Sequence, residues 1–164
     1  MGGAATVRRY VLAALWLAAI AMPSLAEDVF IGVASVIDGD TIEVHGQRIR
    51  LHGIDAPESR QACRAAGGGE YRCGQQAALA LAERIGRRVV RCEGLDVDRY
   101  KRVIAVCRLD GTDLNAWMVS EGLALAYRQY SRDYIDQEDA AKAARRGLWA
   151  GTFRPPWEWR KKKK

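Results

Sequence analysis

The chain has 164 residues with 26 basic and 20 acidic side chains, and this length suits one domain. Its net positive charge comes from the two ends, where Arg8, Arg9, Arg160 and Lys161–Lys164 lie, and the rest is nearly neutral. The overall charge is therefore no evidence for nucleic-acid binding. Such evidence must come from the positions of individual arginines.

The first residues have the pattern of a secretory signal peptide. Arg8 and Arg9 precede an apolar run at 11–21, and small residues follow as far as Ala26. The run is shorter than the roughly 20 residues that cross a bilayer. We expect cleavage after Ala26, a signal peptide over 1–26, and a secreted or periplasmic protein without stable membrane insertion. An uncleaved membrane anchor is the alternative.

The first half of the mature chain predicts β-structure. Alternating apolar residues indicate strands at about 29–36, 40–46 and 48–54. Residues 44–47 are expected to form a hairpin turn between the second and third strands, because Gly46 can take a positive φ.

The second half predicts helices together with two more strands. The strands are expected at 88–92 and 103–109, with an exposed loop between them. Residues 151–159 contain two prolines and two tryptophans and are expected to wrap over the body in an extended form. Helices are expected at 75–85, where Gly86 would form the C-cap, from an Asp113 cap to about Ser120, and at 133–146.

Four cysteines suggest two disulfides in an exported protein. The sequence permits three pairings. We favour Cys63–Cys73, which closes a glycine-rich loop, and Cys92–Cys107, which links two expected hairpin neighbours. A zinc site is the alternative, but the chain has no C-x-x-C motif and its two histidines lack the usual zinc-ligand spacing.

Three short motifs place charged side chains at turns or strand ends: Ile37–Thr41, Arg50–Glu58 and Asp98–Arg102. A rigid scaffold can aim such side chains. Aspartates suit a hard cation such as calcium or magnesium, and a further carboxylate can take a proton from water. The planar guanidinium group matches two phosphate oxygens. These groups together predict cleavage of a phosphodiester.

The motifs Asp-Gly-Asp-Thr, Arg-x4-Asp-x-Pro-Glu and Asp-x-Tyr-x-Arg occur in one order and at similar spacing in a known family. Over about residues 33–149 the chain resembles the thermonuclease, or staphylococcal-nuclease-like, family. The resemblance implies an α+β fold, a five-stranded OB-fold β-barrel with three α-helices. We expect this domain over 27–154 and a basic C-terminal tail over 155–164.

Two aspartates form the expected metal site. Asp40 and Asp55 would repel one another if they converge, so a bound cation is their natural counter-charge. The resemblance implies that both bind Ca²⁺ together with the backbone carbonyl of Ala56, where the family often has threonine. The alternative for the first motif is a simple turn in which Asp38 bonds its own backbone.

The resemblance assigns catalytic roles to Arg50, Glu58 and Arg102. Glu58 is the expected general base, and the two arginines would steady the phosphate as charge develops. Arg102 could instead form a salt bridge with Asp98 at the hairpin tip. Lys101 stands where the family usually has glycine, which bears on the geometry of this loop.

The expected protein is a monomeric, calcium-dependent endonuclease that cuts DNA and RNA with little sequence preference and leaves 3′-phosphates. The resemblance implies that Tyr100 and Tyr127 pack on the nucleotide, as aromatic faces do with unstacked bases; otherwise they are core or rim aromatics. Two other functions remain open. One is a non-catalytic OB-fold protein that binds nucleic acid or another polyanion, and the other is a structural protein of the envelope.

Overall fold

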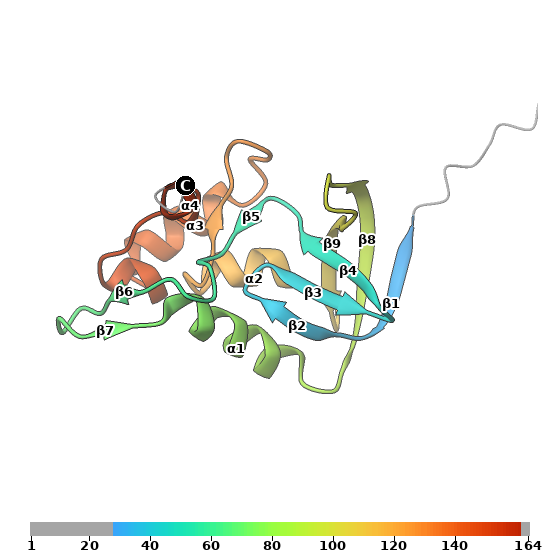
Figure 1. Cartoon of the computed structure of the whole chain (residues 1–164), viewed down its shortest axis with the longest axis horizontal. Coiled ribbons are helices and arrows are strands. Elements are labelled where there is room, and N and C mark those ends of the chain that lie inside the picture. Colours follow the sequence, from blue (N-terminus) through green and yellow to red (C-terminus); the bar gives the residue numbers. More distant parts are fainter. Residues whose placement is uncertain (1–27, 162–164) are drawn as a thin grey trace, which may run out of the picture.

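The computed structural model describes residues 28–161, which form a curled β-sheet with helices packed around it (Figure 1). The strands of this sheet are β1 (Val29–Val33), β2 (Ser35–Asp38), β3 (Thr41–Val44), β4 (Gln47–Leu51), β8 (Val89–Val97), β9 (Val103–Leu109) and β10 (Thr112–Asp113). Across the sheet the order is β1-β8-β9-β4-β3-β2, and β10 pairs with β9. All of these pairs are antiparallel except β4 with β9.

The sheet closes on itself through its first segment. β1 and β2 follow one another with Ala34 between them, yet β1 pairs with β8 at one edge and β2 pairs with β3 at the other. This arrangement joins the two edges and removes most of the exposed strand edge, as a barrel does. The α+β class and the OB-type barrel agree with the prediction, although the predicted strand 29–36 is divided at Ala34.

Helices cover the barrel and extend it at one end (Figure 1). They are α1 (Cys73–Ile85), α2 (Leu114–Ser120), α3 (Ile135–Ala143), a 3₁₀ turn at Gly147–Ala150, and α4 (Pro156–Lys161). The helix α1 packs against β2, and α2 packs against α3 and β9. Asp113 caps α2 as predicted, because its carboxylate accepts a hydrogen bond from the Ala116 amide at 3.0 Å.

One predicted turn and one predicted helix end are confirmed. Val44 pairs with Gln47 across the β3–β4 hairpin, and both turn residues have positive φ, 50° at His45 and 79° at Gly46. This combination matches the twist of the flanking strands. The glycine at position 86 ends α1 with a φ of 57°, also as predicted.

Two predicted boundaries are wrong. The strand predicted over 48–54 stops at Leu51, because Gly53 turns the chain with a φ of 70° and starts a separate strand β5 (Ile54–Asp55), which pairs with β11 (Leu125–Ala126). The helix predicted to reach 146 ends at Ala143, and a positive φ follows at Arg145.

The C-terminal segment also differs from the prediction. Residues 151–159 are not extended throughout, because α4 begins at Pro156. Proline suits the first turn of a helix, where its missing N–H costs no hydrogen bond. The first residues of the expected basic tail therefore form a fourth helix.

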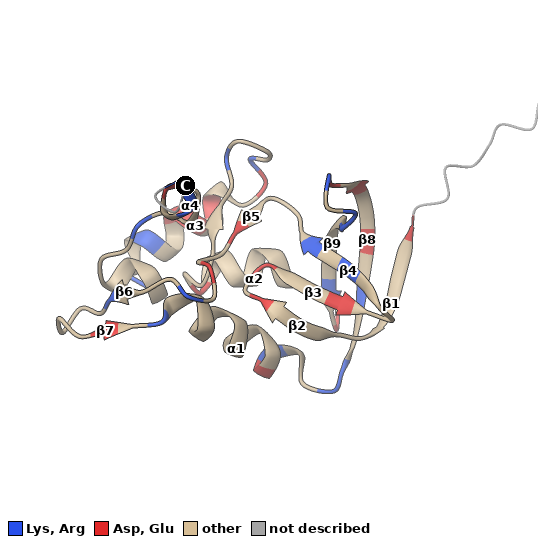
Figure 2. Cartoon of the chain, in the orientation of Figure 1, with Lys and Arg blue, Asp and Glu red and all other residues tan. Residues whose placement is uncertain are grey.

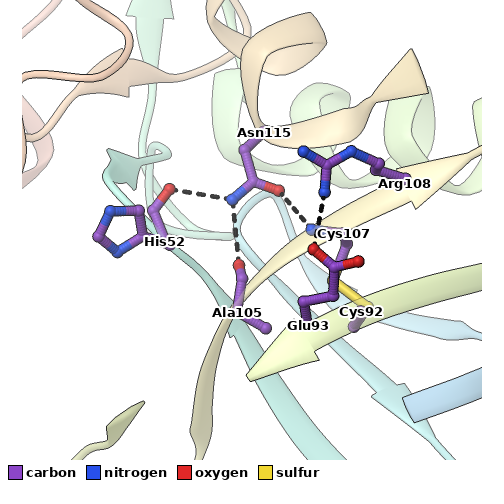
Figure 3. Close-up of a disulfide and its surroundings, with 7 residues drawn as sticks. All are labelled: His52, Cys92, Glu93, Ala105, Cys107, Arg108 and Asn115. Atoms are coloured by element: carbon purple, nitrogen blue, oxygen red, sulfur yellow. Dashed lines mark hydrogen bonds and ion pairs between the residues drawn. A yellow bond between two sulfur atoms is a disulfide. The ribbon is translucent and has the colours of Figure 1, made fainter. Parts of the chain in front are cut away.

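One predicted disulfide, Cys92–Cys107, links β8 and β9 at paired positions (Figure 3). Asn115 lies beside it and is fully buried. Its amide nitrogen donates to the backbone carbonyls of His52 at 3.0 Å and Ala105 at 3.1 Å, and its oxygen accepts from the Cys107 amide at 3.2 Å. Asn115 thereby ties the chain just after β4 to β9, and so supports the turn that leads to β5.

The second predicted disulfide, Cys63–Cys73, joins a small hairpin to the start of α1. The hairpin consists of β6 (Cys63–Arg64) and β7 (Glu70–Tyr71). Both cysteines belong to a second apolar cluster together with Leu125 and Leu148. The two disulfides favour a non-reducing compartment. The predicted signal peptide lies outside the described residues.

Acidic and basic residues are interspersed over the described elements (Figure 2). This agrees with the near neutrality expected for the body of the protein. Within residues 28–161, no helix has the length and apolar character needed to cross a membrane.

Candidate functional site

Asp40 and Asp55 lie side by side, and one guanidinium group joins them. Arg50 Nη1 forms an ion pair with Asp40 Oδ2 at 3.0 Å, and Nη2 donates to Asp55 Oδ1 at 2.9 Å. Asp40 directly precedes β3, whose first residue Thr41 is the register partner of Arg50 on β4. The turn after β4 then returns β5 and its Asp55 to the same place. The expected convergence of the two aspartates is present in the fold.

These carboxylates are held in an unfavourable environment for negative charge. Asp55 is fully buried and Asp40 is 5% exposed. Burial raises the pKa of Asp55, and the charge of Asp40 adds to the rise, while nearby arginines oppose it. Burial and the charge of Asp40 also raise the pKa of Asp38 to about 6. A bound cation would stabilise the charged forms of these carboxylates.

Asp38 has both the role expected of a turn residue and a place near the site. Its carboxylate accepts a hydrogen bond from the backbone amide of Asp40 at 3.2 Å, so the predicted Asx-type turn is present. The rise in the pKa of Asp38 comes first from burial and then from the nearby charge of Asp40, and this backbone hydrogen bond opposes it. The two interpretations of this motif, turn and metal site, are therefore compatible.

The donor set fits a hard divalent cation. The Ala56 amide donates to Asp40 Oδ2 at 3.3 Å, which brings the predicted backbone ligand residue against the first aspartate. Among residues 28–161, no three His, Cys, Asp or Glu side chains are arranged to hold a metal. The predicted site has only two such side chains and one carbonyl, so calcium would complete its shell with water or substrate oxygens.

Glu58 lies on a tightly held turn. Its amide donates to Gln61 Oε1 at 3.3 Å, and the Gln61 amide donates to the Glu58 carbonyl at 2.7 Å. The helix α1 packs directly on this turn, because a Cβ atom on Gly74 would come within 1.9 Å of the Glu58 carbonyl oxygen. The neighbouring Cys63–Cys73 disulfide fixes the start of that helix.

Arg102 reaches the same end of the barrel from the loop between β8 and β9. Its Nη1 donates to Thr41 Oγ1 at 3.4 Å, and Thr41 Oγ1 donates to Asp40 Oδ1 at 2.9 Å. The predicted alternative, a salt bridge to Asp98, is also present at 2.7 Å. Lys101 adopts a φ of 62°, so a lysine takes the left-handed conformation that favours glycine.

The two predicted tyrosines lie beside the site but differ in exposure. Tyr100 is 65% exposed, and its ring lies 5.5 Å from the guanidinium carbon of Arg102. Tyr127 follows β11, the partner of β5, and its ring stacks on Trp157 with centroids 5.6 Å apart. Tyr127 and Trp157 line a cavity of about 680 Å³. Tyr127 therefore lines this cavity and also packs on another aromatic ring of the fold.

A third guanidinium, Arg160 of α4, was not predicted as part of the site. It donates from Nη2 to Asp55 Oδ2 at 2.7 Å and from Nη1 to Asp55 Oδ1 at 3.1 Å. The same Nη1 donates to Glu58 Oε1 at 2.8 Å. Burial would lower the pKa of Arg160, but these hydrogen bonds outweigh burial and raise it.

The sequence does contain a signal that could have located this helix. Pro156 stands at the first helical position, Glu158 lies in the first turn, and Arg160 and Lys161 lie in the last. This is the charge order that complements a helix dipole. The contact of Arg160 with Asp55 spans 105 residues and had no local signal.

The fold and the site define a class of protein: an OB-type barrel that presents paired aspartates and arginines at one end. Residues 48–151 match the model of the staphylococcal nuclease homologue family. The chain belongs to this family.

The chain is similar to proteins that carry different names. The chain is 42% identical to a succinoglycan biosynthesis protein, ExoI, of Rhizobium meliloti over 76% of this chain and 66% of the relative. It is 35% identical to a micrococcal nuclease of Shigella flexneri over 80% of each. It is also 33% identical to an uncharacterized endonuclease of Escherichia coli over 96% of this chain and the whole relative.

Proposed function

We propose that this protein is a secreted or periplasmic, calcium-dependent endonuclease that hydrolyses phosphodiester bonds of DNA and RNA with little sequence preference. The observation that carries the proposal is the convergence of Asp40, Asp55, Arg50 and Arg102 from three separate segments of the chain. Family membership and relatives named as nucleases support the same chemistry. The disulfides support an oxidising location.

Asp40, Asp55 and the Ala56 carbonyl would hold Ca²⁺, which, when bound, supplies positive charge to a phosphate oxygen and orients water. Arg50 and Arg102 are placed to bind the remaining phosphate oxygens as negative charge develops on them. Tyr100 and Tyr127 offer aromatic faces to the bases, which explains the low sequence preference.

In the proposed reaction, the oxygen of a water molecule bonds to phosphorus and Glu58 takes the proton that this water loses. The bond from phosphorus to the 5′-oxygen breaks, and the leaving oxygen takes a proton from solvent. The phosphate stays on the 3′ side. Glu58 suits this task because its turn is fixed by Gln61 and by α1, which reduces the cost of positioning.

The test is cleavage of plasmid DNA and of RNA by the disulfide-intact protein with and without calcium. We expect degradation that EDTA stops and fresh calcium restores. A 5′-labelled oligonucleotide should give products whose mobility changes after removal of a 3′-phosphate. Intact nucleic acid in calcium, with a protein that shows a native circular-dichroism spectrum, would contradict the proposal.

A non-catalytic binder of nucleic acid is the second candidate, and one observation favours it: Arg160 contacts Asp55 and Glu58, two residues that the reaction needs. Calcium titration separates the two candidates. A binder would retain single-stranded DNA equally with calcium or EDTA and release no products. An enzyme would release products in calcium.

A further inference from the structure

The C-terminal segment reaches the proposed active site through two contacts with the Glu58 turn. Arg160 Nη1 bridges the two carboxylates, with 2.8 Å to Glu58 Oε1 and 3.1 Å to Asp55 Oδ1. Gln61, which is fully buried, accepts from the Glu58 amide and donates from Nε2 to the Arg154 carbonyl at 2.7 Å. The segment thus contacts the Glu58 side chain directly and the Glu58 backbone indirectly, through the side chain of Gln61.

Other contacts anchor the same segment away from the carboxylates. The ring of Trp157 stacks on Tyr127 with an interplanar angle of 9°, and Pro156 is buried. Thr152 forms an isolated β-bridge with Arg64, beside the Cys63–Cys73 disulfide. These contacts are not to the reacting groups. The helix α4 is therefore anchored independently of the carboxylates, and it forms a permanent part of the site and not a movable lid.

Glu58 needs such a partner because of its position. Its side chain is 38% exposed, so burial among apolar groups does not fix its rotamer. A general base that must share a water with a metal-bound phosphate requires a fixed distance to the metal ligands. Arg160 contacts Glu58 and Asp55 with one nitrogen, and so sets the separation of the base from a metal ligand.

We propose that Arg160 is a positioning residue of the active site, which holds the Glu58 carboxylate beside Asp55 through the bridging Nη1 contacts. This inference rests on the proposed nuclease function. A cation at Asp55 would share or replace one contact of Arg160 with that carboxylate. The contact with Glu58 uses an oxygen outside the proposed ligand set and stays in place.

The experiment compares Arg160→Ala and Arg160→Lys with the wild-type protein on single-stranded DNA at saturating calcium. We expect Arg160→Ala to lower kcat by about 10- to 100-fold, the scale of a misplaced reacting group, with little change in KM. Arg160→Lys should recover part of kcat, because an ammonium group can contact one carboxylate but lacks the planar fork. Circular dichroism and disulfide content confirm that each variant folds.

A double variant tests whether Arg160 acts through Glu58. In a Glu58→Gln background, Arg160→Ala should cause no further loss of kcat, because the group it positions is already absent. Calcium affinity, measured by calorimetry, should change little in Arg160→Ala. The control is Arg108→Ala, which removes a half-exposed arginine that pairs with Glu93 on β8 (Figure 3).

Each other outcome overturns the inference. An unchanged kcat would show that Arg160 positions nothing. A rise in activity at low calcium, together with tighter calcium binding, would identify Arg160 as a competitor of the metal. An equal loss of kcat in both backgrounds would show that Arg160 acts independently of Glu58. A wild-type protein that cuts nothing refutes the proposed function itself, whereas the other outcomes leave that function intact.

Discussion

Two arginines reach the aspartate pair from regions that are built in different ways. Arg102 is held within its own loop, because Asp98 accepts from its backbone amide at 3.0 Å and from its Nε at 2.8 Å. Arg160 is held by Asp55 and Glu58, which belong to the site itself. The first guanidinium is positioned by local contacts, and the second depends on long-range contacts with the carboxylates.

This difference predicts which changes each side of the site tolerates. The Asp98–Arg102 loop needs only the β8–β9 hairpin and its disulfide to form, so distant substitutions should leave Arg102 in place. The turn that carries Glu58 contacts α1, whose start is fixed by the Cys63–Cys73 disulfide, and Glu58 also contacts α4. A shift in any of these elements would therefore move the Glu58 carboxylate. The two sides can therefore be disturbed separately.

The largest expected effect comes from removing the locally held guanidinium. Arg102→Ala should lower kcat by about 100- to 1000-fold, the usual loss for one donor aimed at developing oxygen charge. Steady-state kinetics on single-stranded DNA measure this loss. Arg108→Ala is the control and should stay within about twofold, as is common for surface substitutions away from a site. A loss below tenfold for Arg102→Ala would mean that Arg102 does not contact the phosphate.

A smaller effect is expected from a substitution in α1 that disturbs the Glu58 turn. Gly74→Ala places a Cβ within 1.9 Å of the Glu58 carbonyl oxygen, so α1 or the Glu58 turn must move. We expect a loss of about 1–3 kcal/mol in unfolding free energy, as for overpacked sites. The accompanying shift of the base should lower kcat by at least about tenfold.

Gly67→Ala is the matched control for this substitution. A Cβ at position 67 meets no atom within 4 Å, and its backbone is not in the left-handed region. Urea denaturation and kinetics should therefore show no significant change. Equal effects of the two substitutions would mean that the contact between α1 and the Glu58 turn does not position the base.

The contrast also explains what sequence reasoning could predict. The β3–β4 hairpin, the Asp113 cap and the Gly86 end of α1 depend on neighbouring residues, and each was predicted. The approach of Arg102 to Asp40 is not local, and its prediction came from the ordered family motifs. The contact of Arg160 with Asp55 depends on how residues 151–161 fold back onto β5 and the Glu58 turn, which neither periodicity nor the motifs indicate.

The catalytic and metal-binding roles remain predictions, although the placement of the residues is now known. Asp38 is an example: the motif was interpreted as either a turn or a metal site, and the turn hydrogen bond is present while Asp40 lies beside Asp55 as a metal site would require. Ala56 is a similar case, because its backbone lies against Asp40 whichever side chain it carries. Sequence motifs identify such positions, and only the fold shows which contacts coexist.

Asp98→Asn sharpens the comparison by weakening the local brace of Arg102 without a change in size. Hydrogen bonds to charged groups contribute about 1.5–3 kcal/mol, so we expect a loss of that order in unfolding free energy. The rate should fall about tenfold, because Arg102 keeps its charge but loses its orientation. Urea denaturation and kinetics measure both quantities. An unchanged rate would show that Thr41 and the backbone suffice to place Arg102.

The stability part of this effect should depend on pH in a defined direction. Burial would raise the pKa of Asp98, but hydrogen bonds from Arg102 and Tyr100 outweigh it and lower the pKa below 3.8. A lowered folded-state pKa stabilises the protein above the unfolded value, and this contribution is lost as pH falls through the folded value. The difference in unfolding free energy between wild type and Asp98→Asn should be constant at neutral pH and shrink below 3.8.

The smallest expected effect concerns the residue next to Arg102. Lys101 has a φ of 62°, so Lys101→Gly relieves strain in the folded state but adds freedom to the unfolded chain, and the net change should be under about 1 kcal/mol. The Lys101 amide donates to the Asp98 carbonyl at 2.9 Å, a backbone contact that glycine retains. Arg102 should therefore keep its position and the rate should stay unchanged. A clear loss of rate with unchanged stability would instead assign the Lys101 ammonium a contact with the phosphate.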